Sequence, residues 1–221
     1  MRTVKTFPIG LSLNDRGHLG EKRCVVLGGG QVAERRIRAL LECGARVKVI
    51  SPTLTLRLSR WAKTAKLTHV ARRYRRGDLK HAFLCIAATS DRAVNEQVWR
   101  EGKANGVLVN TVDDMAHSNF IVPAILRRGD LTIAISTGGT SPALAARIKE
   151  ELAAQFGREY QDLLQILRDA RPRLKVEMDH GKRRHFADAV FDSDIWTLLK
   201  KGKRAAARER VKEILEQCKE T

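Results

Sequence analysis

Two neighbouring carboxylates follow the apolar residues 107–109 of this 221-residue sequence. Asp113 and Asp114 would lie at the end of a strand, where a carboxylate can take a proton from a bound substrate, so the two are candidates for acid–base catalysis. An aspartate-rich turn without catalytic function would have the same sequence. His117 would share a face with Asp113 only in a helix, and a single histidine at such a place is more often a surface or packing residue.

A glycine-rich turn is the second candidate for chemistry. Gly28, Gly30 and Ala33 fit the pattern G-x-G-x-x-A, between an apolar run at residues 23–27 and a stretch with helical spacing. In this pattern the first glycine permits a tight turn, the second lets the backbone approach a pyrophosphate, and the helix N-terminus supplies N–H donors. This context favours dinucleotide binding over a plain glycine turn.

The acid that usually accepts hydrogen bonds from the adenosine ribose is missing from the sequence. About 20 residues after the glycine turn, where this acid is expected, the chain has Ser51, Pro52 and Thr53. A hydroxyl or a backbone group could serve instead. Arg46 and Arg57 are close enough in sequence to bind a 2′-phosphate, so NADP stays open beside NAD.

A second run of glycine and hydroxyl residues begins at Thr137, Gly138 and Gly139. It ends at Ser141 and Pro142, which suit the N-cap and the first position of a helix. Backbone N–H groups in such a run can bind an anion, although a simple connection between a strand and a helix would look similar.

Two other kinds of site have no support in the sequence. No Ser or Cys stands in a nucleophile elbow of the type G-x-S-x-G. The six histidines show neither HxH nor HxxxH spacing, so we predict no metal site made by protein ligands.

Strand-like and helix-like stretches alternate as far as about Asn119, which predicts an α/β fold with a Rossmann-like, doubly wound parallel sheet. The expected strands are residues 23–27, 47–50, 67–71, 83–88 and 107–109, and the expected helices are 32–44 and 93–105. After one more strand at 131–136 the pattern becomes helical, with stretches at 160–170, 186–199 and 205–218 and a break at Pro172.

The composition excludes several classes of protein. An apolar share of 43% rules out disorder and a collagen-like fibre. No stretch approaches about 18 consecutive apolar residues, and residues 1–20 lack the apolar region of a signal peptide, so we expect a cytoplasmic protein without membrane contact. The four cysteines are widely separated, which favours reduced thiols over disulfides.

The charge is strongly positive, with 42 Lys and Arg against 25 Asp and Glu and a net charge of +17. Nine of the basic residues lie between Arg57 and Lys80, where Asp78 is the one acid. The excess points to nucleic acid, anionic lipid or a small polyanionic substrate as partner, or to a generally basic surface.

Four ordered motifs together resemble precorrin-2 dehydrogenase, the module of siroheme synthases. They are residues 24–36, residues 87–91 with Asn95, residues 110–113 leading to 119–125, and residues 134–142. The resemblance is strong from Phe7 to about Phe156, and the methyltransferase part of the trifunctional enzymes has no counterpart in these 221 residues.

The resemblance implies oxidation of precorrin-2 to sirohydrochlorin with NAD as hydride acceptor and, in many members, insertion of Fe²⁺ to give siroheme. It implies that Asp113 is the essential aspartate and that the four ring nitrogens of the substrate, a polycarboxylated tetrapyrrole, hold the metal. The expected NAD contacts are Gly28, Gly30, Gln31, Val32, Pro52 and Thr53, and the expected substrate contacts are Thr137, Gly138 and Gly139. The implied domains are an NAD-binding domain (1–122), a segment that forms a homodimer (123–141) and a helical module (142–221).

Two departures from the family pattern leave the chelatase activity open. Met115 and Ser118 stand where the family often has Pro and Cys, and some relatives dehydrogenate without chelating. A dehydrogenase without chelatase activity is therefore one alternative. A dinucleotide-sensing DNA-binding regulator is another, although no helix-turn-helix stands out and the basic stretch lies inside the nucleotide domain; we expect no nucleic-acid partner.

Overall fold

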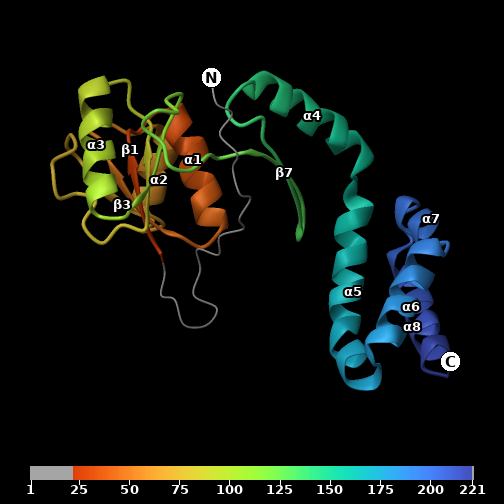
Figure 1. Ribbon diagram of the computed structural model, residues 1–221. Helices are drawn as coiled ribbons and strands as arrows, with labels where there is room; N and C mark the ends of the chain where they lie inside the picture. The colour runs from red at the N-terminus through yellow and green to blue at the C-terminus, as the bar shows by residue number, and fades with distance from the viewer. Residues whose placement is uncertain (1–21, 221) are drawn as a thin grey trace. The chain divides into compact units, whose positions relative to one another are not determined.

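The computed structural model describes residues 22–220, which form two compact units that divide between Val122 and Pro123 (Figure 1). Two expectations from the sequence lie outside the described residues. They are the lack of a signal peptide at residues 1–20 and the start of the family resemblance at Phe7. The units are described one at a time below.

The N-terminal unit contains a five-stranded parallel sheet in the order β3-β2-β1-β4-β5. Its strands are β1 (Arg23–Leu27), β2 (Arg46–Ile50), β3 (Thr68–Val70), β4 (Leu84–Ala87) and β5 (Leu108–Thr111), and its helices are α1 (Gln31–Glu42), α2 (Leu56–Lys63) and α3 (Arg92–Ala104). This strand order is that of dinucleotide-binding folds, and the predicted Rossmann-like sheet is confirmed.

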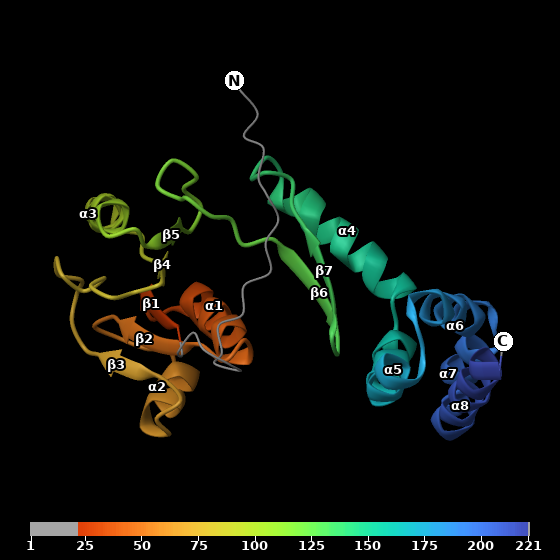
Figure 2. The same cartoon turned by 60° about the horizontal axis from the view of Figure 1, so that its bottom comes forward.

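Alternate residues of β1 enter two hydrophobic cores on opposite faces of the sheet. Cys24 and Val26 pack with Ile37 of α1, while Val25 and Leu27 pack with Val98 of α3. Helices α1 and α2 therefore cover one face and α3 the other, as Figure 2 shows. Such two-sided burial explains why the strands are continuous apolar runs.

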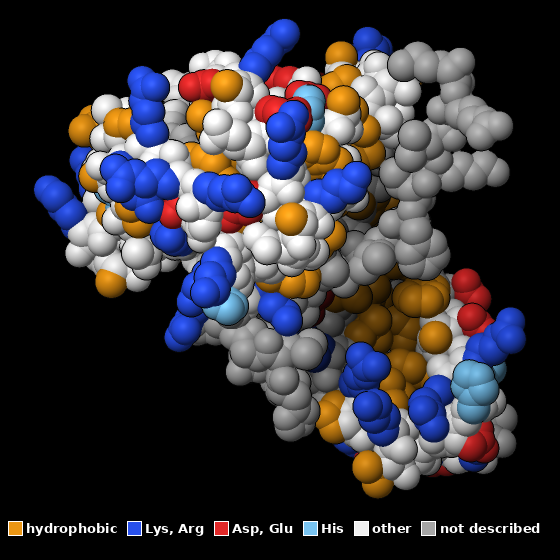
Figure 3. Space-filling model, turned by 60° about the vertical axis from the view of Figure 1, so that its left-hand side comes forward, with side chains coloured by type: hydrophobic (Ala, Val, Ile, Leu, Met, Phe, Trp, Pro, Cys, Tyr) orange, Lys and Arg blue, Asp and Glu red, His pale blue; other side chains and the backbone are white. Residues whose placement is uncertain are grey.

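In the basic stretch of the N-terminal unit, between Arg57 and Lys80, Arg72 is bound to the half-buried Asp78. Asp78 accepts two hydrogen bonds from the Arg72 guanidinium, each of 2.7 Å. This hydrogen bonding holds the pKa of the Asp78 carboxyl below its usual value. Figure 3 shows Lys and Arg side chains spread over the visible face of the molecule, with Asp and Glu between them.

Glu101 is a buried acid, 8% exposed, on which the loop before β4 depends. Its carboxylate accepts hydrogen bonds from the Tyr74 hydroxyl and, at 2.9 Å each, from the backbone N–H groups of Gly77 and Leu79. Glu101→Ala should lower the free energy of unfolding by about 3 kcal/mol, because it leaves three donors, of which the Leu79 N–H is buried, without their acceptor. Chemical denaturation measures this loss. As a control, Glu151→Ala in an exposed ion pair with Arg147 should cost less than about 1 kcal/mol; equal losses would contradict the assignment.

The C-terminal unit joins an antiparallel hairpin to five helices. These elements are β6 (Ala124–Arg128), β7 (Leu131–Ile135), α4 (Pro142–Gln155), α5 (Arg158–Glu177), α6 (His180–Asp192), α7 (Ile195–Lys200) and α8 (Arg204–Glu220). One core holds α5 to α8 together through residues such as Ile166, Val190 and Ile214. The predicted helical content of this region is confirmed.

Two helix boundaries in this unit differ from the prediction. Helix α5 continues through Pro172, where a break was expected, because Leu163, Ile166 and Leu174 keep one face of the helix on the core. The stretch predicted as one helix at 186–199 is divided at Ser193, whose hydroxyl bonds the carbonyl of Val190 and accepts from the N–H of Ile195. Across residues 22–220 no helix is long and apolar enough to cross a membrane.

Candidate functional site

The glycine turn after β1 contains two glycines that the protein's own backbone requires. Gly28 has a φ of +103°, and a Cβ there would lie 2.2 Å from the carbonyl oxygen of Ala88. A Cβ on Gly29 would lie 2.0 Å from the carbonyl oxygen of Thr53. The turn therefore passes directly against the segments that follow β4 and β2.

Gly30 is different, because it faces open space. A Cβ at this position would meet nothing within 4 Å, and the residue is the N-cap of α1 with an ordinary φ of −85°. No side chain caps the helix there. The first N–H groups of α1, with the exposed Gln31 and Val32, are thus accessible to an anionic ligand.

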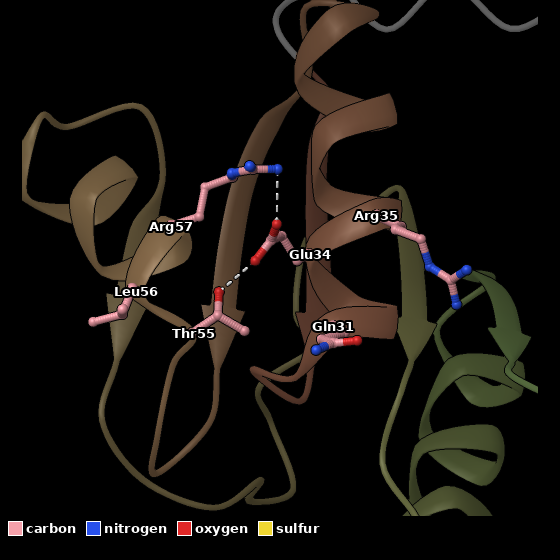
Figure 4. A pocket seen from close by; sticks show the side chains of 6 residues that line it. All are labelled: Gln31, Glu34, Arg35, Thr55, Leu56 and Arg57. Atoms are coloured by element: carbon pink, nitrogen blue, oxygen red, sulfur yellow. Dashed lines mark hydrogen bonds and ion pairs between the residues drawn. The ribbon is translucent and has the colours of Figure 1, made fainter.

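A cavity of about 510 Å³ lies between the N-terminal ends of α1 and α2. Figure 4 shows the residues that line it, which are Gln31, Glu34, Arg35, Thr55, Leu56 and Arg57. The Glu34 carboxylate accepts a 2.6 Å hydrogen bond from the Thr55 hydroxyl and forms a 3.1 Å ion pair with Arg57. The acid that the sequence lacks after β2 is therefore replaced by Glu34, which comes from α1 and contacts Thr55 and Arg57.

The residues that directly follow β2 differ in exposure. Pro52 and Thr53 are exposed at the carboxyl edge of the sheet, whereas Ser51 is buried and its hydroxyl bonds the Thr53 carbonyl at 2.7 Å. Arg46, a candidate for a 2′-phosphate, begins β2 and so lies at the opposite edge of the sheet. Arg57 remains near the cavity, paired with Glu34.

Asp113 lies in a turn directly after β5, at the same edge of the parallel sheet as the glycine turn. Its side chain is exposed and its φ of +59° is left-handed, a conformation that is uncommon for residues other than glycine and that often marks functional sites. The turn is fixed at its base, because the Ser118 hydroxyl accepts from the N–H of Thr111 at 2.9 Å and donates to the carbonyl of Asp114 at 2.7 Å.

Of the two neighbouring carboxylates, Asp114 has structural partners. It forms a 2.6 Å contact with Nδ1 of His117, and this hydrogen bond lowers the pKa of Asp114. His117 does not share a helical face with Asp113, because residues 112–118 form a turn. Asp113 is therefore the better placed of the two for chemistry on a bound molecule.

Arg36 of α1 is a residue near Asp113 to which the sequence assigned no role. Its side chain is half-buried, and burial together with the neighbouring Arg35 lowers its pKa, while the charge of Asp113 raises it. Arg36 is thus a cation whose charge interacts with that of Asp113. Its place in the motif at residues 24–36, three residues after Ala33, was the signal from which a role for Arg36 could have been predicted.

Thr137, Gly138 and Gly139 belong to the C-terminal unit, in the turn between β7 and α4. Gly138 and Gly139 have φ values of +62° and +83°, and the Thr137 hydroxyl accepts from the N–H of Ser141 at 3.0 Å. Ser141 in turn caps α4 by accepting from the N–H of Leu144, as predicted.

The described part of the chain holds no group of three or more His, Cys, Asp or Glu that could bind a metal ion. The site geometry is thus that of a dinucleotide fold with one acidic turn at its carboxyl edge.

Comparisons with known proteins agree with this geometry. Residues 18–124 match the family described as "Putative NAD(P)-binding", and residues 128–155 match the family "Sirohaem biosynthesis protein central". The siroheme synthase of Methylobacillus flagellatus is 34% identical over 96% of this chain, and that of Photobacterium profundum is 36% identical over 87%. The chain spans 44% and 41% of the lengths of these two proteins.

The solved structure of "SirC, precorrin-2 dehydrogenase" is similar over 98% of this chain and 100% of its own length, with a TM-score of 0.77 and 28% identity. Both family matches, the curated relatives and this structure point the same way. The chain is therefore similar, over most of its length, to siroheme synthases and to the precorrin-2 dehydrogenase SirC.

Proposed function

We propose that this chain oxidises precorrin-2 to sirohydrochlorin, with NAD as the hydride acceptor. The observation that carries the proposal is that the open glycine turn after β1 and the Asp113 turn after β5 lie at one edge of the same parallel sheet. A dinucleotide with its pyrophosphate at Gly28, Gly30, Gln31 and Val32 extends along this edge toward β4 and β5. Its nicotinamide then lies on the side of Asp113.

Asp113 is proposed as the base of the reaction. Precorrin-2 loses a hydride, which goes to the nicotinamide and gives NADH, and a proton, which goes to the Asp113 carboxylate. Arg36, whose charge interacts with that of Asp113, is proposed to bind an acetate or propionate group of the substrate. Thr137, Gly138 and Gly139 are proposed to bind further carboxylates through backbone N–H groups.

We expect NAD rather than NADP, because Glu34 lines the cavity and is held there by Thr55 and Arg57, which follow β2. Its carboxylate can accept from ribose hydroxyls and repels a 2′-phosphate, and it neutralises Arg57. NAD is also the cofactor that the family resemblance implies.

Glu34→Gln should lower the preference for NAD over NADP about 10-fold, measured as the ratio of the two kcat/KM values, because it removes the repulsion and leaves Arg57 to bind the phosphate. Glu42→Gln, at the far end of α1, is the matched control and should leave the ratio unchanged. An unchanged ratio in Glu34→Gln would show that Glu34 does not select the cofactor.

Insertion of Fe²⁺ into sirohydrochlorin is proposed as a second reaction of the same site. Two pyrrole nitrogens must lose protons when the metal enters, and Asp113 is proposed to accept them one at a time, passing the first to solvent before it takes the second. Ser118, which replaces the Cys that the family often has, serves to hold the Asp113 turn. The alternative is a dehydrogenase without chelatase activity, and the rate of Fe²⁺ or Co²⁺ insertion into purified sirohydrochlorin distinguishes the two.

The proposed assembly is a homodimer formed through residues 123–141, and the proposed location is the cytoplasm.

The test of the dehydrogenase activity is incubation with precorrin-2 and NAD without oxygen. NADH absorbance should rise as sirohydrochlorin forms, and unchanged absorbance would refute the proposal.

A further inference from the structure

We infer that His117 is a positioning residue that ties the turn carrying Asp113 to helix α3 through both of its ring nitrogens. The inference rests on the proposed function in one respect, that Asp113 is the base. It concerns a residue that neither the sequence motifs nor the proposed reaction use.

The geometry at His117 is that of a link between two elements. Nδ1 lies 2.6 Å from Oδ2 of Asp114 in the turn, and Nε2 lies 2.6 Å from Oε2 of Glu96 on α3. A neutral imidazole carries one N–H and can donate to one carboxylate at a time. Both contacts are hydrogen bonds only when the ring is a positively charged imidazolium.

The surroundings of His117 favour this charged form. The hydrogen bond with Asp114 and then that with Glu96 raise the pKa of His117, against a smaller opposing effect of burial. Arg100 on α3 binds the other oxygen of Glu96 at 2.6 Å, and the edge of Trp99 lies against the ring, with centroids 6.3 Å apart. These groups, with Asp114 of the turn, are the charged and aromatic side chains that face His117.

The link bears on Asp113 because Asp114 is the next residue in the chain. Oδ1 of Asp114 also accepts from the backbone N–H groups of Ala116 and His117, at 3.1 and 3.3 Å, so its carboxylate organises the whole turn. Loss of the proton from His117 removes one of its two hydrogen bonds and releases one end of the link. A base displaced by a fraction of an ångström transfers protons more slowly.

The pH dependence has a definite sign. Because the folded-state pKa of His117 is raised, the stabilisation is fully present below its ordinary value of 6.5 and is lost as the pH rises through the raised value. The pKa values of Asp114 and Glu96 are lowered by their hydrogen bonds, so their contribution is lost only when the pH falls through those lowered values. The turn is held most firmly between these limits.

The test combines NMR titration of the histidine rings with pH profiles of NADH formation. In the full-length protein His117, assigned by its loss in His117→Gln, should titrate above 6.5, and Glu96→Gln should move that titration to lower pH. The high-pH limb of kcat should move by the same amount, with the KM for NAD unchanged. His117→Gln should lower kcat about 10-fold, and the exposed His185→Gln, the matched control, should change nothing.

The outcomes separate this inference from the proposed function. If the protein forms no NADH but His117 titrates as expected, the link is present and the proposed function is wrong. In that case faster hydrogen exchange of the amides of residues 112–118 in Glu96→Gln than in the unaltered protein, at one pH, still supports the tethering of the turn. Titration of His117 at pH 6.5 or below, or a high-pH limb of kcat that is unchanged in Glu96→Gln, would overturn the inference.

Discussion

Replacing Asp113 by Asn should reduce kcat for NADH formation by about 100- to 10,000-fold, the contribution usual for a general base. The amide has nearly the same shape as the carboxylate but cannot take a proton. Asn also tolerates the left-handed backbone at this position, where φ is +59°, so the turn should keep its structure. Anaerobic kinetics gives kcat, and titration with NAD should show cofactor binding that is unchanged within about two-fold.

Two further variants show whether the loss comes from chemistry or from structure. Asp113→Gly should be inactive but at least as stable as the unaltered protein, because glycine removes the cost of the positive φ. Asp114→Asn keeps the base and weakens the contact with His117, so it should lose only about 10-fold. An active Asp113→Asn, or an equal loss at Asp114, would show that Asp113 is not the base.

Gly28→Ala and Gly30→Ala should have opposite effects, although the two residues stand in one turn. Gly28→Ala should lower the free energy of unfolding by more than about 2 kcal/mol, because φ is +103° and the new Cβ would lie 2.2 Å from the Ala88 carbonyl oxygen. Gly30→Ala should leave stability within about 0.5 kcal/mol, because its Cβ meets nothing. Gly30→Ala should instead raise the KM for NAD at least about 10-fold, since the methyl group occupies the place of the pyrophosphate.

Thermal unfolding and NAD titration of both variants check this contrast. Gly106→Ala is a suitable control, because Gly106 has a φ of +66° with open space around it and lies before β5, away from the carboxyl edge. It should cost about 1 kcal/mol of stability and leave NAD binding unchanged. Normal NAD affinity in Gly30→Ala would contradict the placement of the cofactor.

The sheet could be predicted from the sequence because its central strands β1 and β4 are buried on both faces and so appear as continuous apolar runs. The glycine turn was predictable for a related reason, since a positive φ at Gly28 leaves few other residues possible there. The boundaries at Pro172 and Ser193 were not, because they depend on packing against helices distant in the sequence. Local propensity is weaker than such packing.

The site was predictable only in its residues close in sequence. The sequence pattern places a ribose-binding acid at the end of β2, whereas the structure supplies Glu34 from α1 and holds it through Thr55 and Arg57. The contact of His117 with Glu96 and the approach of Arg36 to Asp113 likewise join segments that are far apart in the chain. Such contacts depend on which strands and helices become neighbours in the fold, and the residue types along the sequence do not show this.

Oxidation of precorrin-2 by NAD is tested most directly by a single-turnover reaction without oxygen, with the protein in excess over precorrin-2 and NAD saturating. NADH and sirohydrochlorin are followed together by absorbance. They should appear in equal amounts and at one rate, and with Asp113→Asn both should appear about 100- to 10,000-fold more slowly. Sirohydrochlorin that forms without NADH, or precorrin-2 that persists unchanged, would contradict the proposed function.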